Sequence, residues 1–254
     1  RNVPGAKRQY AALLGSSRFI HESLASGESV WIAQSEGRAK DGVDLTDPAI
    51  LKMFTLADRG SALGELLRRL RVVPVSIAYE YDPCDTMKAR ELTLRAASGS
   101  YEKPEGEDLR SLALGLAGHK GRVVLNVGSP LDADFASPEA AAAEIDRQIL
   151  SGYQLFPVNY LALERLAEMP APDREDANDS EATNSNAYGS HAEGLAEARR
   201  QVSADALFKP SPADREAFAA RIERCPAEYR RRWLEAYANP ILNKLRCGVP
   251  LASR

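Results

Sequence analysis

Residues 36–42, EGRAKDG, gather the residue types that bind an anionic ligand carrying hydroxyl groups. The guanidinium of Arg38 is a planar fork that matches phosphate oxygens, and the amine of Lys40 is a mobile point charge. Glu36 would weaken anion capture unless its carboxylate accepts a hydrogen bond from a hydroxyl of the ligand. A phosphorylated polyol meets both conditions, although charged loops that contain glycine are also common surface turns.

The elements that must position these residues begin with an apolar run directly before them. That run, "VWIAQ" from Val30, and two others, "VVPVSIAYEY" from Val72 and "RVVLNVGSPL" from Arg122, are nearly continuous in apolar residues. Such runs indicate strands that are covered on both faces. Ligands bind at strand ends in open α/β sheets, and Gly37 and Gly42 permit a positive φ or a close backbone approach there.

Helices are predicted between and after these strands. Thr46 or Asp47 can cap a helix with Pro48 in its first turn, and Leu63 to Leu70 repeat at helical spacing. Further helices are expected over 85–98, over 106–119 with a stop at Gly118, and over 139–150. The alternation favours an α/β domain, with a layered mixed or parallel sheet flanked by helices and a C-terminal helical extension.

Three regions are expected along the chain. Residues 1–168 form the α/β domain, and residues 169–200 form a polar mobile loop that has too few large aliphatic side chains to offset its ordering entropy. Residues 201–254 form the helical extension, which Pro226 breaks or kinks. Its segment "YRRRW" suits either a membrane surface or a helix packed on the domain.

The composition is that of an ordinary globular protein. The 254 residues are 44% hydrophobic, and 33 basic residues against 36 acidic ones argue against a dedicated nucleic-acid binder. Three widely spaced cysteines show no metal-ligand spacing and no disulfide framework, which indicates a reducing compartment. No apolar run is long enough to span a membrane, and we expect neither a metal nor a resident cofactor.

The EGRAK segment resembles the third sequence block of the glycerol-phosphate acyltransferase superfamily, which reads Glu-Gly-Thr-Arg-Ser or Glu-Gly-Gly-Arg-Ser-Arg after an apolar strand. Glu36 and Gly37 match directly. Arg38 matches after deletion of one residue, and Lys40 then takes the place of the next basic residue. The family's fourth block, a Val-Pro strand, is similar to "VVPVSI". The resemblance covers roughly residues 1 to 168, and the order and spacing of the two blocks make it moderately specific.

The resemblance implies an O-acyltransferase of phospholipid synthesis. Such an enzyme moves a fatty acyl group from acyl-CoA or acyl carrier protein to a hydroxyl of glycerol-3-phosphate or 1-acylglycerol-3-phosphate. The implied substrate-binding residues are Glu36, Gly37, Arg38 and Lys40, together with Pro74 of the Val-Pro strand and Arg1 in the place of the arginine that ends the second block. A peripheral contact with the cytoplasmic face of a membrane is implied as well.

The chain departs from the family in lacking the His-x-x-x-x-Asp block, which supplies the general base and the carboxylate that orients it. None of His21, His119 and His191 has an aspartate five positions later, so no catalytic residue is assigned. Either the chain is a fragment without its catalytic segment, or it is a noncatalytic module that binds phospholipid or phosphate at a membrane surface. A generic α/β phosphate binder is a third reading.

Several other residues could do chemistry but have simpler interpretations. Asp82 and Asp85 flank Cys84 and resemble a carboxylate pair around a nucleophile, yet a proline-containing turn with Asp85 as a helix cap is the simpler interpretation. Glu80 at a strand end could approach the site, and Lys52 one turn past Pro48 could point back at a bound phosphate. A solvated side chain is the simpler interpretation for Lys52.

Overall fold

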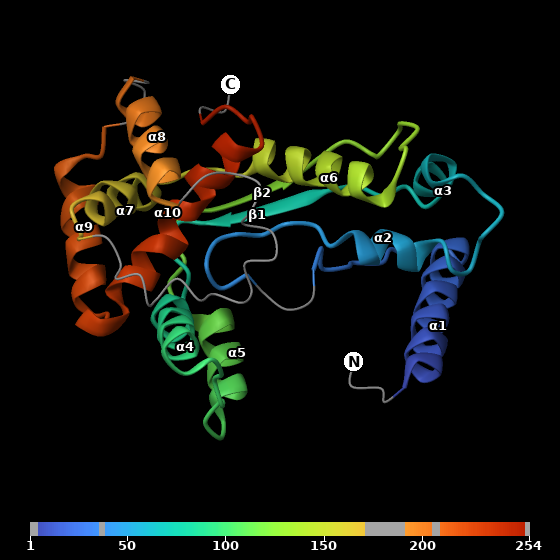
Figure 1. Ribbon diagram of the computed structural model, residues 1–254, viewed down its shortest axis with the longest axis horizontal. Helices are drawn as coiled ribbons and strands as arrows, with labels where there is room; N and C mark the ends of the chain where they lie inside the picture. The colour runs from blue at the N-terminus through green and yellow to red at the C-terminus, as the bar shows by residue number, and fades with distance from the viewer. Residues whose placement is uncertain (1–4, 36–38, 171–190, 205–208, 252–254) are drawn as a thin grey trace. The chain divides into compact units, whose positions relative to one another are not determined.

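The computed structural model describes residues 5–35, 39–170, 191–204 and 209–251. Four of the predicted site residues, Arg1, Glu36, Gly37 and Arg38, lie outside the described residues, as does the stretch 171–190 of the predicted polar loop. The described chain is of the mixed α/β class and is dominated by helices (Figure 1).

The helices predicted from Pro48 onward, near 63–70, over 85–98, over 106–119 and over 139–150 begin and end close to their expected bounds. Residues 191–200, which were expected to belong to the polar mobile loop, are helical instead. The described helices are α1 (Ala6–Ala25), α2 (Pro48–Phe54), α3 (Leu63–Arg69), α4 (Asp85–Ser98), α5 (Glu107–Ala117), α6 (Pro138–Gly152), α7 (Pro157–Ala167), α8 (His191–Ala204), α9 (Pro212–Glu223), the short 3₁₀ helix η3 (Ala227–Tyr229) and α10 (Arg230–Arg246). The carboxylate of Asp47 accepts a 2.8 Å hydrogen bond from the backbone N–H of Ala49, which confirms the predicted cap. Gly118 ends α5, and Pro226 separates α9 from α10, both as predicted.

The strands β1 (Val75–Tyr79) and β2 (Val123–Val127) pair in one antiparallel sheet. The pairing continues beyond both ends, since the N–H of Glu80 donates to the Arg122 carbonyl at 2.9 Å and the N–H of Gly128 donates to the Pro74 carbonyl at 2.8 Å. A layered sheet with parallel strands is not seen in the described residues. The predicted strand at 30–34 is wrong, because the structure has no strand there: the Gln34 carbonyl accepts one 2.8 Å hydrogen bond from the N–H of Asp47, and Trp31 is 70% exposed.

The expectation that the strands are covered on both faces is also wrong for β2. Its outward side chains Val123, Leu125 and Val127 are 50%, 60% and 63% exposed, while the residues between them are half-buried. Apolar composition alone predicted a strand here but could not show which faces are covered.

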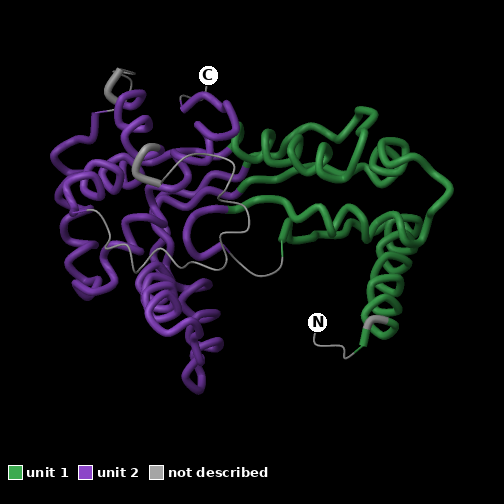
Figure 2. The backbone as a smooth tube through the Cα atoms, viewed as in Figure 1, with its two compact units in different colours: residues 1–38, 44–76, 126–152 green, residues 39–43, 77–125, 153–254 purple. Residues whose placement is uncertain are grey.

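The chain divides into two compact units (Figure 2). Unit 1 consists of residues 1–38, 44–76 and 126–152, and unit 2 of residues 39–43, 77–125 and 153–254, so the boundary falls inside both strands. In unit 1, α2 packs against α1 and α6. Its core gathers buried side chains from α1, α2, α3, α6 and the stretch after β2: Ile20, Ile50, Leu51, Phe54, Leu66, Leu67, Leu131, Ala141, Ala142 and Ile145.

The core of unit 2 is built around α10, which packs against α7 and α4. Trp233 is fully buried and stacks at a tilt on Tyr237, with ring centroids 4.5 Å apart. The "YRRRW" segment is therefore part of a helix packed on the unit, and its tryptophan is not available to enter a membrane. The unit boundaries do not coincide with the predicted divisions after residues 168 and 200, since residues 201–254 belong to the same unit as α4 and α7.

Candidate functional site

Of residues 36–42, the structure describes only the part from Ala39 onward, and this part packs against helices of unit 2. Segment 39–43 belongs to unit 2, although the residues on either side of it belong to unit 1. The amine of Lys88 on α4 donates to the Ala39 carbonyl at 3.0 Å. From α10, the side-chain amide of Asn239 donates to the Asp41 carbonyl at 2.7 Å and that of Asn243 to the Gly42 carbonyl at 3.0 Å. Helices α4 and α10 therefore fix this short segment through its backbone.

Gly42 confirms the predicted need for a glycine. Its φ is +77°, a conformation that other residues rarely adopt, and a Cβ at this position would collide with the carbonyl oxygen of Ala236 on α10. Pro240 lies inside α10 and has no N–H to donate to that carbonyl four residues before it. The backbone of segment 39–43 thus approaches the helix where the helix lacks one of its own hydrogen bonds.

Lys40 is the one cation of the predicted site that the structure describes, and its side chain contacts α4. Its amine forms an ion pair with Glu91, whose side chain is only 8% exposed. The same Glu91 oxygen accepts a 3.0 Å hydrogen bond from the guanidinium of Arg95. Two cations therefore share one carboxylate oxygen, while Lys40 and Arg95 keep 29% and 33% of their side chains exposed to solvent.

Lys88 adds a third cation beside segment 39–43. Its amine contacts both the Ala39 carbonyl and a carboxylate oxygen of Asp82, the latter at 2.5 Å. We name Lys40, Lys88 and Arg95, with their carboxylate partners Asp82 and Glu91, the cation cluster. Three cationic side chains therefore lie near segment 39–43, which suits an anionic ligand.

Sequence reasoning missed most of the cation cluster. Lys88, Glu91 and Arg95 are spaced at i, i+3 and i+7 along α4, which places them on one face of the helix. This signal was present in "KARELTLR", but nothing in the sequence indicated that Lys40 packs on that face. Of the other predicted site residues, Pro74 is a buried residue of unit 1 whose carbonyl accepts a ladder hydrogen bond.

The acidic turn before α4 is structural. A carboxylate oxygen of Asp82 accepts from the N–H of Cys84, which confirms the predicted turn. Asp85 is the first residue of α4 rather than its cap, and its carboxylate accepts from the guanidinium of Arg221 at 2.8 Å and from the hydroxyl of Tyr237 at 2.9 Å. The thiol of Cys84 is buried and donates to the Ser111 carbonyl at 3.4 Å, so it is not exposed as a nucleophile.

The remaining candidates also have partners inside their own units. His21 contacts the Phe54 carbonyl at 3.0 Å, and His119 stacks on Tyr81. Two guanidinium nitrogens of Arg122 donate hydrogen bonds to the Glu80 carboxylate oxygens, at 3.1 and 2.8 Å. This pairing lowers the pKa of the Glu80 carboxyl. Lys52 pairs with Glu139 at 2.8 Å, and the pair lowers the pKa of Glu139 to about 2. None of these pairs resembles a histidine–aspartate general base.

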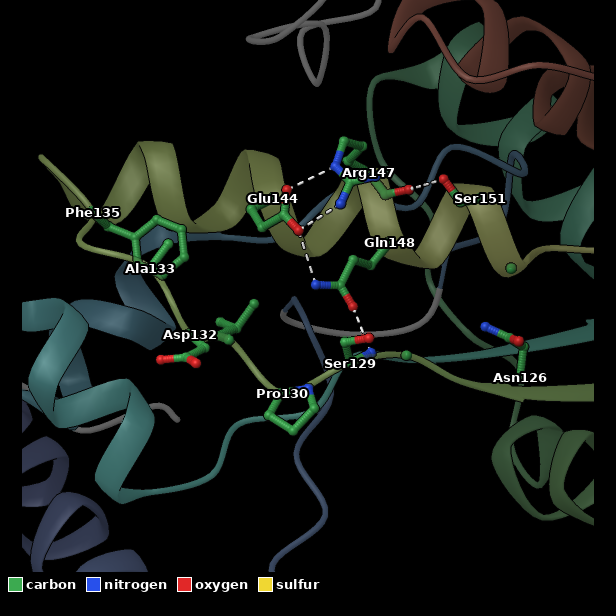
Figure 3. A pocket seen from close by; sticks show the side chains of 13 residues that line it. Asn126, Ser129, Pro130, Asp132, Ala133, Phe135, Glu144, Arg147, Gln148 and Ser151 are labelled. Atoms are coloured by element: carbon green, nitrogen blue, oxygen red, sulfur yellow. Dashed lines mark hydrogen bonds and ion pairs between the residues drawn. The ribbon is translucent and has the colours of Figure 1, made fainter.

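Unit 1 contains an open pocket of about 600 Å³ between α6 and the stretch that follows β2 (Figure 3). The side chain of Gln148 crosses it, since its oxygen accepts from the N–H of Ser129 and its nitrogen donates to Glu144. Arg147 is held by the same Glu144 through two 2.7 Å contacts. Arg147 is the single cation among the residues that line this pocket, whereas the cation cluster contains three, so the pocket is the weaker candidate for an anion site.

In the part of the chain that the structure describes, no group of three or more His, Cys, Asp or Glu side chains is placed to hold a metal ion. Among the same residues, no helix is long and apolar enough to cross a bilayer. Comparison with models of protein families, with curated proteins and with solved structures gave no match.

Proposed function

We propose that the cation cluster binds the phosphate of glycerol-3-phosphate or 1-acylglycerol-3-phosphate, as the acceptor site of an O-acyltransferase in phospholipid synthesis. Acyl-CoA or acyl carrier protein would be the donor. The observation that carries this proposal is the convergence of Lys40, Lys88 and Arg95 at segment 39–43, directly after the EGR residues.

The charge distribution supports phosphate as the ligand. A phosphate monoester carries a charge between about −1.5 and −2 near neutral pH. It can accept hydrogen bonds from the amine of Lys40 and the guanidinium of Arg95, both of which carry several N–H groups and lie beside the Glu91 oxygen that they share. In this proposal Arg38 adds a forked phosphate contact, and Glu36 accepts a hydrogen bond from a glycerol hydroxyl.

The proposed reaction moves an acyl group from the thioester sulfur of the donor to a hydroxyl oxygen of the acceptor. The glycerol hydroxyl oxygen attacks the thioester carbonyl carbon, the carbon–sulfur bond breaks, and the hydroxyl proton ends on the released thiol. The residues of this chain are assigned the acceptor half: they bind the phosphate and orient the hydroxyl. The resemblance implies that a histidine of a His-x-x-x-x-Asp block removes the proton, and these 254 residues contain no such block.

A second candidate function is favoured by helix α5. Its leucines Leu109, Leu112 and Leu116 lie on one side of the helix and are 72%, 56% and 76% exposed. An amphipathic helix that exposes its apolar face can lie in a lipid interface, so the chain would serve as a noncatalytic phospholipid-binding module there. In either function we assign the peripheral contact with the cytoplasmic face of the membrane to α5.

Calorimetric titration with glycerol-3-phosphate tests the acceptor site. Replacing Lys40 or Lys88 by methionine should weaken binding about ten-fold or more, because each variant loses a hydrogen bond to a charged group. Lys52→Met is the matched control, since it removes an ion-paired lysine of unit 1. Equal affinity of all three variants and the unchanged protein would rule out the cation cluster.

Turnover separates the two candidate functions. The release of free thiol from acyl-CoA or acyl carrier protein, dependent on glycerol-3-phosphate, would support the enzyme. Saturable binding of the acceptor without thiol release by the complete encoded protein would support the binding module instead.

A further inference from the structure

Helix α10 holds segment 39–43 by two amide side chains that lie one helical turn apart. Asn239 and Asn243 are 6% and 4% exposed, and each donates to a backbone carbonyl of a segment about 200 residues earlier in the chain. Buried amides that bond a loop backbone fix its path, because the loop carbonyls would otherwise be left without partners once water is excluded.

The contact surface on α10 is shaped for this segment. Gly42 lacks the Cβ that would strike the Ala236 carbonyl, and Pro240 leaves that carbonyl without its usual helical donor. Lys40 lies two residues before Gly42 and reaches Glu91 on α4. The position of its amine therefore depends on where the backbone of segment 39–43 is held.

We infer that Asn239 and Asn243 are positioning residues for anion binding: they fix segment 39–43 on α10 and so place the Lys40 amine in the cation cluster. This inference rests on the proposed acceptor site. The two hydrogen bonds from Asn239 and Asn243 to segment 39–43, which we call the clamp, are present in the structure whatever the ligand is. This positioning role gives the C-terminal helix a direct part in acceptor affinity without any contact with the ligand.

The clamp is tested by the variants Asn239→Leu and Asn243→Leu, which remove the amide donors at similar size and add no charge. Backbone ¹⁵N relaxation of Gly42 and Val43 should give order parameters near 0.85 in the unchanged protein and below about 0.6 in the double variant. Gly42→Ala should have the same effect by a different route, because its Cβ pushes the segment off α10.

Asn159→Leu is the matched control. Asn159 is also a buried amide of unit 2, and it donates to the Tyr237 carbonyl at 2.8 Å and accepts from the N–H of Phe156. This variant should lower the stability of the fold as much as the others, while the order parameters of segment 39–43 stay high. Equal loosening of the segment in the control variant would reduce the asparagine pair to a general stabilising role and overturn the inference.

The functional part is tested by glycerol-3-phosphate titration of the same variants. The double variant should bind about ten-fold more weakly, and the control should bind like the unchanged protein. Unchanged order parameters, or a loosened segment with undiminished affinity, would overturn the positioning role. If the unchanged protein binds no glycerol-3-phosphate, the proposed acceptor site fails and the positioning role fails with it, while the order parameters still decide whether the clamp exists.

Discussion

Lys244 is a buried lysine whose replacement should stabilise the protein. It lies in α10, is 0% exposed, and its amine has no hydrogen-bond partner among the residues that the structure describes. Burial lowers the pKa of this amine from 10.5 to about 8, because the charged ammonium is removed from water. Lys244→Met keeps an unbranched, flexible side chain that is one heavy atom shorter, and it removes the charge.

The size of the effect follows from the pKa. The pKa of the amine falls from 10.5 to about 8, and one pKa unit corresponds to about 1.36 kcal/mol. The buried ammonium therefore lowers the free energy of unfolding by about 3 kcal/mol at neutral pH. Lys244→Met should raise the free energy of unfolding by most of this amount, because it removes the charge, and any poorer packing of the thioether would reduce the gain. Urea denaturation of both proteins at pH 7 measures the difference directly.

A pH series provides an independent check of the cause. Between pH 8 and 10.5 the unfolded chain still binds the proton that the folded protein has lost, so raising the pH through this window stabilises the folded state of the unchanged protein. The advantage of Lys244→Met should therefore shrink towards pH 10.5. A variant that is no more stable at pH 7, or an advantage that is constant from pH 7 to 10.5, would refute the reasoning.

Two further predictions concern other parts of unit 2. Arg122→Leu removes the two-nitrogen grip on Glu80 and should lower the free energy of unfolding by about 1.5 kcal/mol at pH 7, a modest effect because the guanidinium is 61% exposed. Because the pairing lowers the pKa of Glu80, this difference should begin to shrink as the pH falls below the ordinary glutamate pKa of 4.5 and should be lost as the pH falls further through the lowered pKa of the folded protein. Chemical denaturation at pH 7 and at a series of acidic pH values checks it. Replacing the three exposed leucines of α5 by serine should abolish sedimentation with phosphatidylglycerol vesicles, whereas serine at the exposed Phe19 and Trp31 of unit 1 should not. Equal vesicle binding by both variants would exclude α5 as the membrane contact.

Local signals in the sequence predicted most of the secondary structure. The bounds expected for α4 match the structure, and the start of α2 at Pro48 follows from the Asp47 cap, because capping and side-chain spacing act within one or two turns. The strand expected at 30–34 failed for the opposite reason. A strand needs a partner, and an apolar run does not state whether one is present.

The cation cluster illustrates what the sequence could not give. Lys40 was predicted as a phosphate ligand from its neighbours, but its pairing with Glu91 joins residues 51 positions apart, and the Asn243–Gly42 bond joins residues 201 apart. Such contacts depend on how the chain returns on itself, which no local pattern encodes. The sequence indicated that the backbone at Gly42 lies close to another part of the protein, but it did not indicate that this part is α10.

Where glycerol-3-phosphate binds is the most direct test of the central claim. Backbone amide shifts recorded by NMR during a titration would locate the ligand on the protein. The account predicts saturable changes centred on Lys40, Lys88, Glu91 and Arg95, and none with glycerol, which lacks the phosphate. Changes centred on Ser129 and Gln148 in the pocket of unit 1, or no saturable change at all, would contradict it.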